Sequence, residues 1–298
     1  MSVMILNSKP KPSNSKYKEV KPVKDPKNIE NDARRRLKGL TEPVQLELDL
    51  LMQNIDGMTP KEVAAELERI KKYYDYQIDG IANGVAQSWV DAVNDYNRTQ
   101  TMETMRKSLG INIAAIVDEA MKDDLDIMVM EAAHYIKTIP DYLIGRVTDR
   151  VVQHFKGIPM PEGRTLRQQI KEEFHVSDGR AKVLARDQTA KMNTSLNAIR
   201  QTNLGIDTYI WKTANDERVV GRPGGKYPKI SKLHRNHWMM QGLLCKWEDP
   251  TVYSDDKGKT WKKRLQEMPQ VHPGVDIMCR CRAAPYIDIE KLRVKWTS

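Results

Sequence analysis

The chain has 298 residues and a formal net charge of +9; 40% of its residues are hydrophobic and 30% are charged. That apolar content is enough for a packed core, which excludes wholesale disorder. The apolar runs are too short for a membrane span, and the short apolar start before lysine and proline is unlike a secretory signal. Three cysteines are too few for a disulfide framework, so we expect a reducing compartment.

The positive charge is concentrated in two segments. Residues 1–40 contain eleven Lys or Arg against four Asp or Glu, and residues 221–265 have the same balance, so the remainder is acidic by five charges. Separated basic segments indicate contact with DNA or with an acidic protein surface, although both segments can also be simply solvated. The residues predicted to make this contact are Arg34, Arg35, Arg36, Lys257, Lys259, Lys262, Lys263 and Arg264.

The N-terminal region is rich in lysine and proline. Residues 1–30 hold four prolines and seven lysines with few large apolar groups, which predicts an extended segment ordered only along another chain. We assign residues 1–50 to this extended basic arm. Within it, Asn31 or Asp32 can cap a basic helix that Pro43 interrupts or restarts.

Residues 51–205 predict a helical body. Thr59-Pro60-Lys61-Glu62 is a strong helix start, and apolar residues follow it at spacings of three and four as far as Tyr96. We predict a second helix over 113–136, separated by Pro140 from a third that ends near 155. A short helix over 165–174 precedes a last helix, capped near Ser177 and ending near 205.

Residues 206–298 have a different composition and predict a small module. Residues 207–213 alternate apolar and polar side chains and are rich in β-formers, so they predict a strand, and residues 284–289 predict a returning strand. The expected fold class is α+β, with a mostly helical N-terminal body followed by a small C-terminal α+β module of short strands.

The module contains side chains of metal-ligand type: His237, His272, Cys279 and Cys281. Two cysteines that are two positions apart on an extended segment share a face, so both thiolates can reach one zinc ion. A disulfide between such close neighbours would be strained. His234 and Cys245 are possible substitutes as ligands, and a packed cluster without metal is the alternative. In either case we expect the first four side chains to converge in space.

Other catalytic motifs are missing from the sequence. It has no glycine-rich phosphate loop, no nucleophile elbow, no His-Glu-x-x-His helix and no deaminase signature, so an enzyme is not expected. The rival hypothesis is a metal-dependent hydrolase or nuclease acting on nucleic acid. Its open ion would lie among His234, His237, His272 and Asp216.

One ordered set of motifs is more specific than any of these fragments. Ala185-Arg186-Asp187-Gln188-Thr189 is followed by Asn197, Arg200-Gln201 and Leu204-Gly205-Ile206, and then by Tyr209-x-Trp211-x-Thr213-Ala214-x-Asp216-Glu217-Arg218-Val219. His237-x-x-Met240-x-Gly242, His272-Pro273-Gly274 and Cys279-Arg280-Cys281-Arg282 complete the set. In this order the motifs, over roughly residues 163–288, resemble the phage Mu F-like minor capsid family, also called phage head morphogenesis proteins.

The resemblance implies a low-copy virion component of a tailed phage, and it does not imply an enzyme. Such proteins join the procapsid during assembly in the host cytoplasm, lie in the head interior or at the portal vertex, and serve DNA packaging or ejection. The implied partners are the portal or major capsid protein and packaged double-stranded DNA, with no membrane. The implied motif residues are Arg186, Asp187, Trp211, Asp216, Arg218, His237 and Arg280. The sequence departs from the family pattern at Val220, where a second arginine is usual, and in the basic insertion 221–236.

Overall fold

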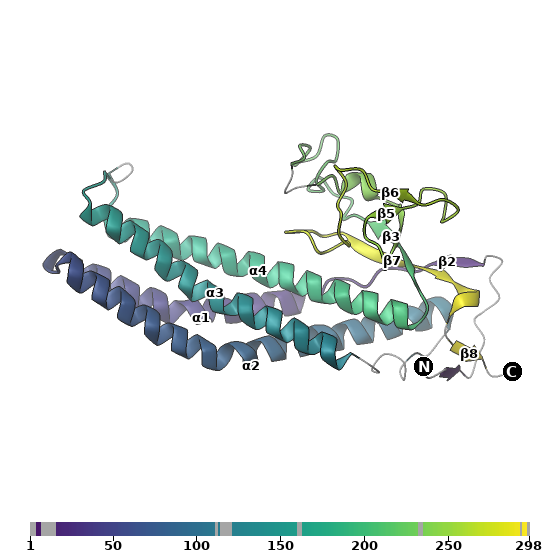
Figure 1. The fold of residues 1–298 in the computed structure, drawn as a ribbon, viewed down its shortest axis with the longest axis horizontal. Coiled ribbons are helices and arrows are strands. Elements are labelled where there is room, and N and C mark those ends of the chain that lie inside the picture. Colours follow the sequence, from purple (N-terminus) through teal and green to yellow (C-terminus); the bar gives the residue numbers. More distant parts are fainter. Residues whose placement is uncertain are drawn as a thin grey trace. The chain divides into compact units, whose positions relative to one another are not determined.

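The computed structural model describes residues 4–6, 16–110, 113, 121–159, 163–231, 235–292 and 294–296 (Figure 1). Within them the chain forms four long helices followed by short strands, which confirms the predicted α+β class with a mostly helical N-terminal body. The chain divides into two compact units, each built from separate segments. We call residues 27–91 and 124–188 the helical unit, and residues 1–26, 92–123 and 189–298 the mixed unit.

The helices are α1 (Lys27–Gln53), α2 (Pro60–Leu109), α3 (Lys122–Phe155) and α4 (Leu166–Asn203). The predicted start of α2 is confirmed in atomic detail: Glu62 accepts the Thr59 backbone N–H at 2.7 Å, and the Thr59 hydroxyl accepts the Glu62 N–H at 3.3 Å. This reciprocal capping box satisfies two N–H groups that a helix start otherwise leaves without partners. Proline at the first helical position adds a preset backbone angle.

Several predicted helix boundaries are wrong. Helix α1 continues through Pro43 and α3 through Pro140. Helix α4 begins after Thr165 as predicted, but it has no break at Phe174 or Ser177, and Ser177 is fully buried within it. Of the predicted helix over 113–136, residues 114–120 lie outside the described residues, and α3 begins at Lys122.

The basic helix predicted within the arm over 1–50 is confirmed as part of α1, although it begins earlier, at Lys27. The extended character predicted for the arm, ordered only along another chain, is wrong where the structure describes it. Residues 27–53 form α1, whose Val44 and Leu48 are fully buried in the core of the helical unit. Residues 17–19 form strand β2 (Tyr17–Glu19), which pairs with the same chain, and Val20 and Val23 are buried. The arm therefore orders against its own chain because these few apolar side chains find a core there. Residues 7–15 lie outside the described residues.

The core of the helical unit lies between segments of all four helices. Its fully buried residues follow the predicted three-and-four spacing on α2, where Val63, Leu67 and Ile70 face inward. Glu173 on α4 is buried there too, and it pairs with Arg146 and Arg150 of α3. Burial alone would raise the pKa of Glu173, but the two guanidinium groups outweigh it and lower the pKa.

The mixed unit contains a four-stranded sheet in the order β2-β7-β3-β4, with all pairs antiparallel. Its other strands are β3 (Thr208–Lys212), β4 (Leu244–Lys246) and β7 (Arg282–Asp288), so both predicted strands of the module are confirmed. Strands β5 (Val252–Tyr253) and β6 (Lys262–Lys263) form a hairpin, and β1 (Met4–Leu6) pairs in parallel with β8 (Val294–Trp296).

Two apolar clusters cover the sheet within the mixed unit. One packs Val20 and Ile287 against Met105 and Leu109 at the end of α2. The other surrounds Tyr209 and Trp211 of β3, which are both fully buried. The predicted composition boundary near 205 coincides with the end of α4 at Asn203, whereas the compact units divide within α2 and α4. Short 3-10 turns at Trp238–Met240 and Ile289–Lys291 complete the unit.

Candidate metal centre

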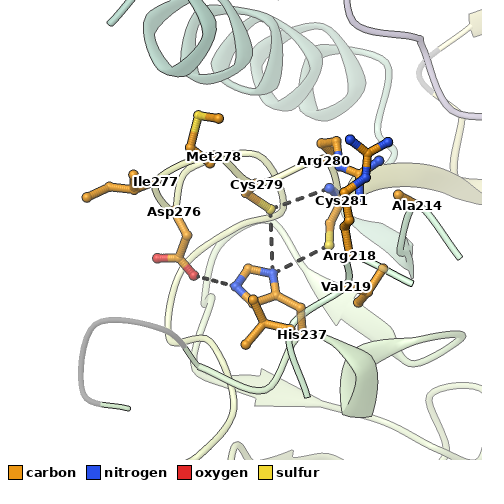
Figure 2. Close-up of a pocket in the computed structure, with 11 residues that line it drawn as sticks. Ala214, Arg218, Val219, His237, Asp276, Ile277, Met278, Cys279, Arg280 and Cys281 are labelled. Carbon is orange, nitrogen blue, oxygen red and sulfur yellow. Dashed lines mark hydrogen bonds and ion pairs between the residues drawn. The ribbon is translucent and has the colours of Figure 1, made fainter. Parts of the chain in front are cut away.

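His237, Cys279 and Cys281 form a compact ligand-type cluster in the mixed unit (Figure 2). His237 directly precedes the turn Trp238–Met240, and the two cysteines end the loop that leads into β7. The Nδ1 atom of His237 lies 3.5 Å from Cys279 Sγ and 3.4 Å from Cys281 Sγ, and all three ligand atoms lie within 4.8 Å of one another. The predicted convergence of these three residues is therefore confirmed.

Packing against α4 fixes the loop that carries the cysteines. Gly274 has a φ of +92°, and a Cβ atom there would lie 2.5 Å from the Thr194 hydroxyl oxygen. That hydroxyl donates to the Pro273 carbonyl at 2.8 Å. The position therefore requires glycine for both its backbone angle and its close approach to the helix. This explains the glycine of the His272-Pro273-Gly274 motif.

The opposite edge of the His237 ring faces a carboxylate. His237 Nε2 lies 3.0 Å from Asp276 Oδ2, and Figure 2 shows the ring between this carboxylate and the two sulfur atoms. Burial lowers the pKa of His237, but Asp276 and Cys279 outweigh it and raise the pKa to about 9. A carboxylate behind a ligand histidine fixes the tautomer that presents the other nitrogen to a metal. The sequence reasoning missed Asp276, because a lone aspartate carries no metal-ligand spacing.

The surroundings of Cys279 favour its thiolate form. Cys281 and His237 both hydrogen-bond to Cys279 and hold its pKa well below the usual value, while the pKa of Cys281 is raised because it faces that developing charge. Two backbone N–H groups, from Gly274 and Cys281, also point at Cys279 Sγ at 3.4 Å. A thiolate supported in this way is prepared to bind a metal ion.

The motif residues Asp216 and Arg280 form an ion pair beside the cluster. Arg280 makes two hydrogen bonds to the carboxylate, one of them 2.5 Å long, and the pair joins the loop after β3 to the loop before β7. The Arg280 hydrogen bonds lower the pKa of Asp216 to about 2. Arg218 is a second partner of this carboxylate: its backbone N–H donates to Asp216 at 3.0 Å, and its guanidinium lies 3.9 Å away.

The metal-site prediction is wrong for His272. Its Nδ1 lies 3.0 Å from the Tyr209 hydroxyl, and its ring packs 5.0 Å from the ring of Trp247, so it belongs to the apolar core. Burial lowers its pKa to about 4, which keeps the ring neutral. Cys245 is also buried in this core and is not part of the cluster. His234 lies outside the described residues.

Further motif residues link α4 and the sheet inside the mixed unit. Gln201 accepts a hydrogen bond from the Trp247 indole N–H at 3.0 Å, and Arg200 donates to Asn97 at 2.5 Å. Trp211 packs 6.0 Å from the His237 ring, measured between ring centroids.

The motif residues Arg186 and Asp187 lie on the part of α4 that belongs to the helical unit, where Arg186 is half-buried and Asp187 is buried.

The predicted contact residues differ in exposure. Lys257, Lys259, Lys262 and Lys263 are exposed on or near the β5–β6 hairpin, and Arg34, Arg35 and Arg36 are exposed on α1. Arg264 is 6% exposed, and its prediction as a surface contact is wrong. Its guanidinium donates to the carbonyls of Pro269 and Val271 and lies 5.3 Å from the centre of the Trp211 ring. The cation is buried because backbone oxygens and an aromatic face replace its water.

A cavity of about 50 Å³ lies beside the cluster. Besides the cluster and Asp276, its walls are Ala214, Arg218, Val219, Val220, Ile277, Met278 and Arg280. This is space for an ion with one small additional ligand. Two thiolates and one imidazole are a donor set that suits zinc, and among the described residues they supply three of the four ligands of a tetrahedral site. The residues present therefore fit the expected metal.

The comparisons with known proteins give one distant relative. An uncharacterized protein of Haemophilus influenzae is 23% identical over 292 residues, which cover 94% of this chain and 58% of that protein. The chain thus spans somewhat over half the length of that relative. No family model matches the chain, and no solved structure matches it. In the described part of the chain, none of the helices has the length and apolar character needed to cross a membrane.

Proposed function

We propose that the chain is a minor capsid, or head morphogenesis, protein of a tailed phage. The observation that carries the proposal is how its ordered motif residues are used. Trp211 and Asp216 come from β3 and the loop after it, whereas His237 and Arg280 come from two segments further along the sequence. The four residues meet in one small cluster of packing, ion pairing and ligand-type contacts. Because these residues contact one another in the folded chain, we expect a protein of this fold to carry the motifs together.

The proposed role follows from the resemblance and the charge distribution. The protein would join the procapsid in the host cytoplasm, dock on the portal or major capsid protein, and stay in the virion at the head interior or portal vertex. It would there assist DNA packaging or ejection. The exposed lysines of the hairpin are suited to phosphate groups of packaged DNA, since non-specific DNA contact depends mainly on such charges.

We infer further that His237, Cys279 and Cys281 hold a structural zinc ion. Zinc would supply a crosslink between the turn at 238–240 and the loop before β7, and its binding free energy would stabilise the fold around that loop. Asp276 would orient His237 through Nε2, so that Nδ1 faces the ion. The two thiols and the imidazole must release their protons to bind it, and the polarised Cys279 thiol makes that release easier.

The rival function is a metal-dependent hydrolase or nuclease. The ligand set predicted for it does not assemble in the described residues, because His272 contacts Tyr209 and Asp216 pairs with Arg280. A different set, His237 with the two cysteines, leaves one coordination position, as in an open catalytic zinc site. However, His237 is 7% and Cys281 5% exposed, and the nearest carboxylate, Asp276, already faces His237. Zinc-loaded protein that leaves supercoiled DNA and single-stranded oligonucleotides intact would favour the structural role. Metal-dependent cleavage that Cys281→Ala abolishes would favour the enzyme.

Particles test the head-protein assignment directly. Phage particles purified from the strain that encodes the chain should contain its peptides at a few copies per portal by quantitative mass spectrometry. Deleting its gene should leave heads that are misassembled, empty or non-infectious, and expression of the chain from a plasmid should restore infectivity. Particles that lack the chain, or a deletion strain with normal phage yield, would contradict the proposal.

Metal content tests the zinc inference independently. The purified chain should carry about one zinc ion, and Cys279→Ala or Cys281→Ala should lose it, whereas Cys245→Ala, which removes a thiol outside the cluster, should keep it. Asp276→Asn should keep the ligands but weaken zinc affinity by roughly 10- to 100-fold in chelator competition. Equal zinc content in the Cys245 and Cys281 variants would rule out this site.

A further inference from the structure

The outer face of the four-stranded sheet carries two stacked aromatic rings. Along β3 the side chains alternate, so that Tyr209 and Trp211 are buried while Thr208 is half-buried on the opposite face. Tyr286 of β7 is half-buried, and Tyr17 of β2 is 43% exposed. Their ring centroids lie 5.3 Å apart with an angle of only 6° between the planes. A further planar ring can extend such a parallel stack at its exposed side.

A cavity of about 330 Å³ adjoins this stack within the mixed unit. Tyr17, Tyr286 and Thr208 form the wall on the sheet, while Lys257 and Trp261 line it from the hairpin. Lys246 Nζ lies 4.8 Å from the centre of the Trp261 ring, which holds the indole beside the sheet. The volume is at the lower end of the range for small-molecule sites.

The charges around the cavity leave cations available for an anionic group. Of the three acidic lining residues, Glu248 lies 3.1 Å from Lys246, and Asp288 accepts the Glu290 backbone N–H at 3.1 Å. Within the described ranges, neither Lys257 nor Lys291 takes part in an ion pair, so both ammonium groups can contact an anion. The carboxylate of Asp207, the third acidic lining residue, can accept a hydrogen bond from a ligand. Aromatic faces, two lysines and one acceptor match a base, its phosphates and an N–H donor on the edge of the base.

We propose that this cavity binds a nucleotide of a single-stranded nucleic acid. The base stacks on the Tyr17–Tyr286 pair, and the flanking phosphates contact Lys257 and Lys291. Proteins that bind single strands without sequence preference combine aromatic stacking with a basic groove in this way. A cationic peptide fits less well, because two of the three carboxylates are already engaged. The proposal stands independently of the head-protein assignment, since it rests only on the geometry of the cavity.

Titration of the full-length protein with a short fluorescein-labelled oligothymidine, followed by anisotropy, tests the site. Replacing both rings, by Tyr17→Leu with Tyr286→Leu, should weaken binding about five-fold or more, because each stacked base contributes substantially to affinity. The matched Phe double variant keeps the rings and should bind like the original protein. Tyr76→Leu, which removes a 79% exposed ring of the helical unit, is the control for exposed tyrosines.

The arms of the experiment separate the alternatives. A matching oligouridine measures whether RNA binds as well as DNA, and a far-ultraviolet spectrum shows that the Leu double variant remains folded. A folded Leu double variant with unchanged affinity would overturn the proposal, because binding would then depend only on contacts between lysines and phosphates. So would the absence of binding to either oligonucleotide at low salt, or binding of a fluorescein-labelled oligoarginine peptide that is tighter than that of the oligonucleotides and is lost in the Leu double variant.

Discussion

The ion pair between Asp216 and Arg280 should make a measurable contribution to the stability of the fold. The folded-state pKa of Asp216, about 2, is below its ordinary 3.8, so the pair stabilises the fold above pH ~4 and loses that contribution as pH falls through ~2. About a third of the Asp216 side chain is exposed, so solvent screens the pair. We therefore expect Asp216→Asn to cost only about 1 kcal/mol at pH 7.

Urea unfolding followed by tryptophan fluorescence measures this effect, since five of the six tryptophans lie in residues 206–298. The difference between Asp216→Asn and the original protein should shrink as pH falls from 4 towards 2. Asp255→Asn removes the partner of Lys262 in an exposed pair and should leave stability unchanged. An equal loss in both variants would mean that the loop connection made by Arg280 has no special role.

Spacing in the sequence revealed some site residues and misassigned others. Cys279 and Cys281 were predictable because two thiols that are two positions apart on an extended segment share a face. His272 has the right chemistry but is taken up by Tyr209, and Arg264 is buried among backbone carbonyls despite its basic neighbours. Both errors arise because side-chain type does not say which contacts a loop will provide.

At the scale of elements, the helix starts that carry a capping box were predicted accurately. The Thr59 and Thr165 capping boxes depend on contacts within four residues, so the sequence contains all the information needed. Pro43 and Pro140 lie inside helices, where proline removes one hydrogen bond. The helices continue because tertiary burial, which a local pattern does not contain, outweighs that loss. Pro140 is itself buried, and Ser177 is fully buried rather than exposed as a cap.

The strand β2 and the residues after it are a stabilising element of the mixed unit. Val20 is 1% exposed and packs with Met105 and Ile287. Val20→Ala should therefore cost about 2 kcal/mol, because two methyl groups leave a core that cannot fully collapse around the gap. Denaturant unfolding measures this loss. Val176→Ala, at a 42% exposed site on α4, should have little effect, and equal losses in the two variants would contradict the role of this segment.

At the scale of the whole molecule, the two units should respond differently to loss of metal. If the cluster holds zinc, its binding free energy is part of the folding free energy of the mixed unit only. Adding a strong zinc chelator should raise amide hydrogen exchange in the loop 272–281 and in β3 and β7, while amides of α1 and α3 keep their protection. Unchanged exchange in the loop, or equal acceleration in both units, would contradict a structural zinc in this cluster.

The exposed lysines of the hairpin should govern binding to duplex DNA. Each lysine that neutralises a phosphate contributes about 0.9 to the slope of log affinity against log salt concentration. Changing Lys257, Lys259, Lys262 and Lys263 to Gln should therefore flatten that slope by up to about 3.6 for duplexes of any sequence. Arg264 is left in place because its guanidinium is buried and supports the core.

A variant of equal charge distinguishes local contact from a general effect of net charge. The control changes four exposed lysines of the helical unit to Gln, namely Lys61, Lys72, Lys171 and Lys182. Because phosphate contact is local and screened within about 10 Å at 0.1 M salt, the control should keep the original slope. If both variants flatten the slope equally, the hairpin is not the DNA-binding surface. If neither variant flattens the slope, the hairpin lysines are either solvated or in contact with an acidic protein partner. Measuring the affinity of the hairpin variant for the portal protein then distinguishes these two cases.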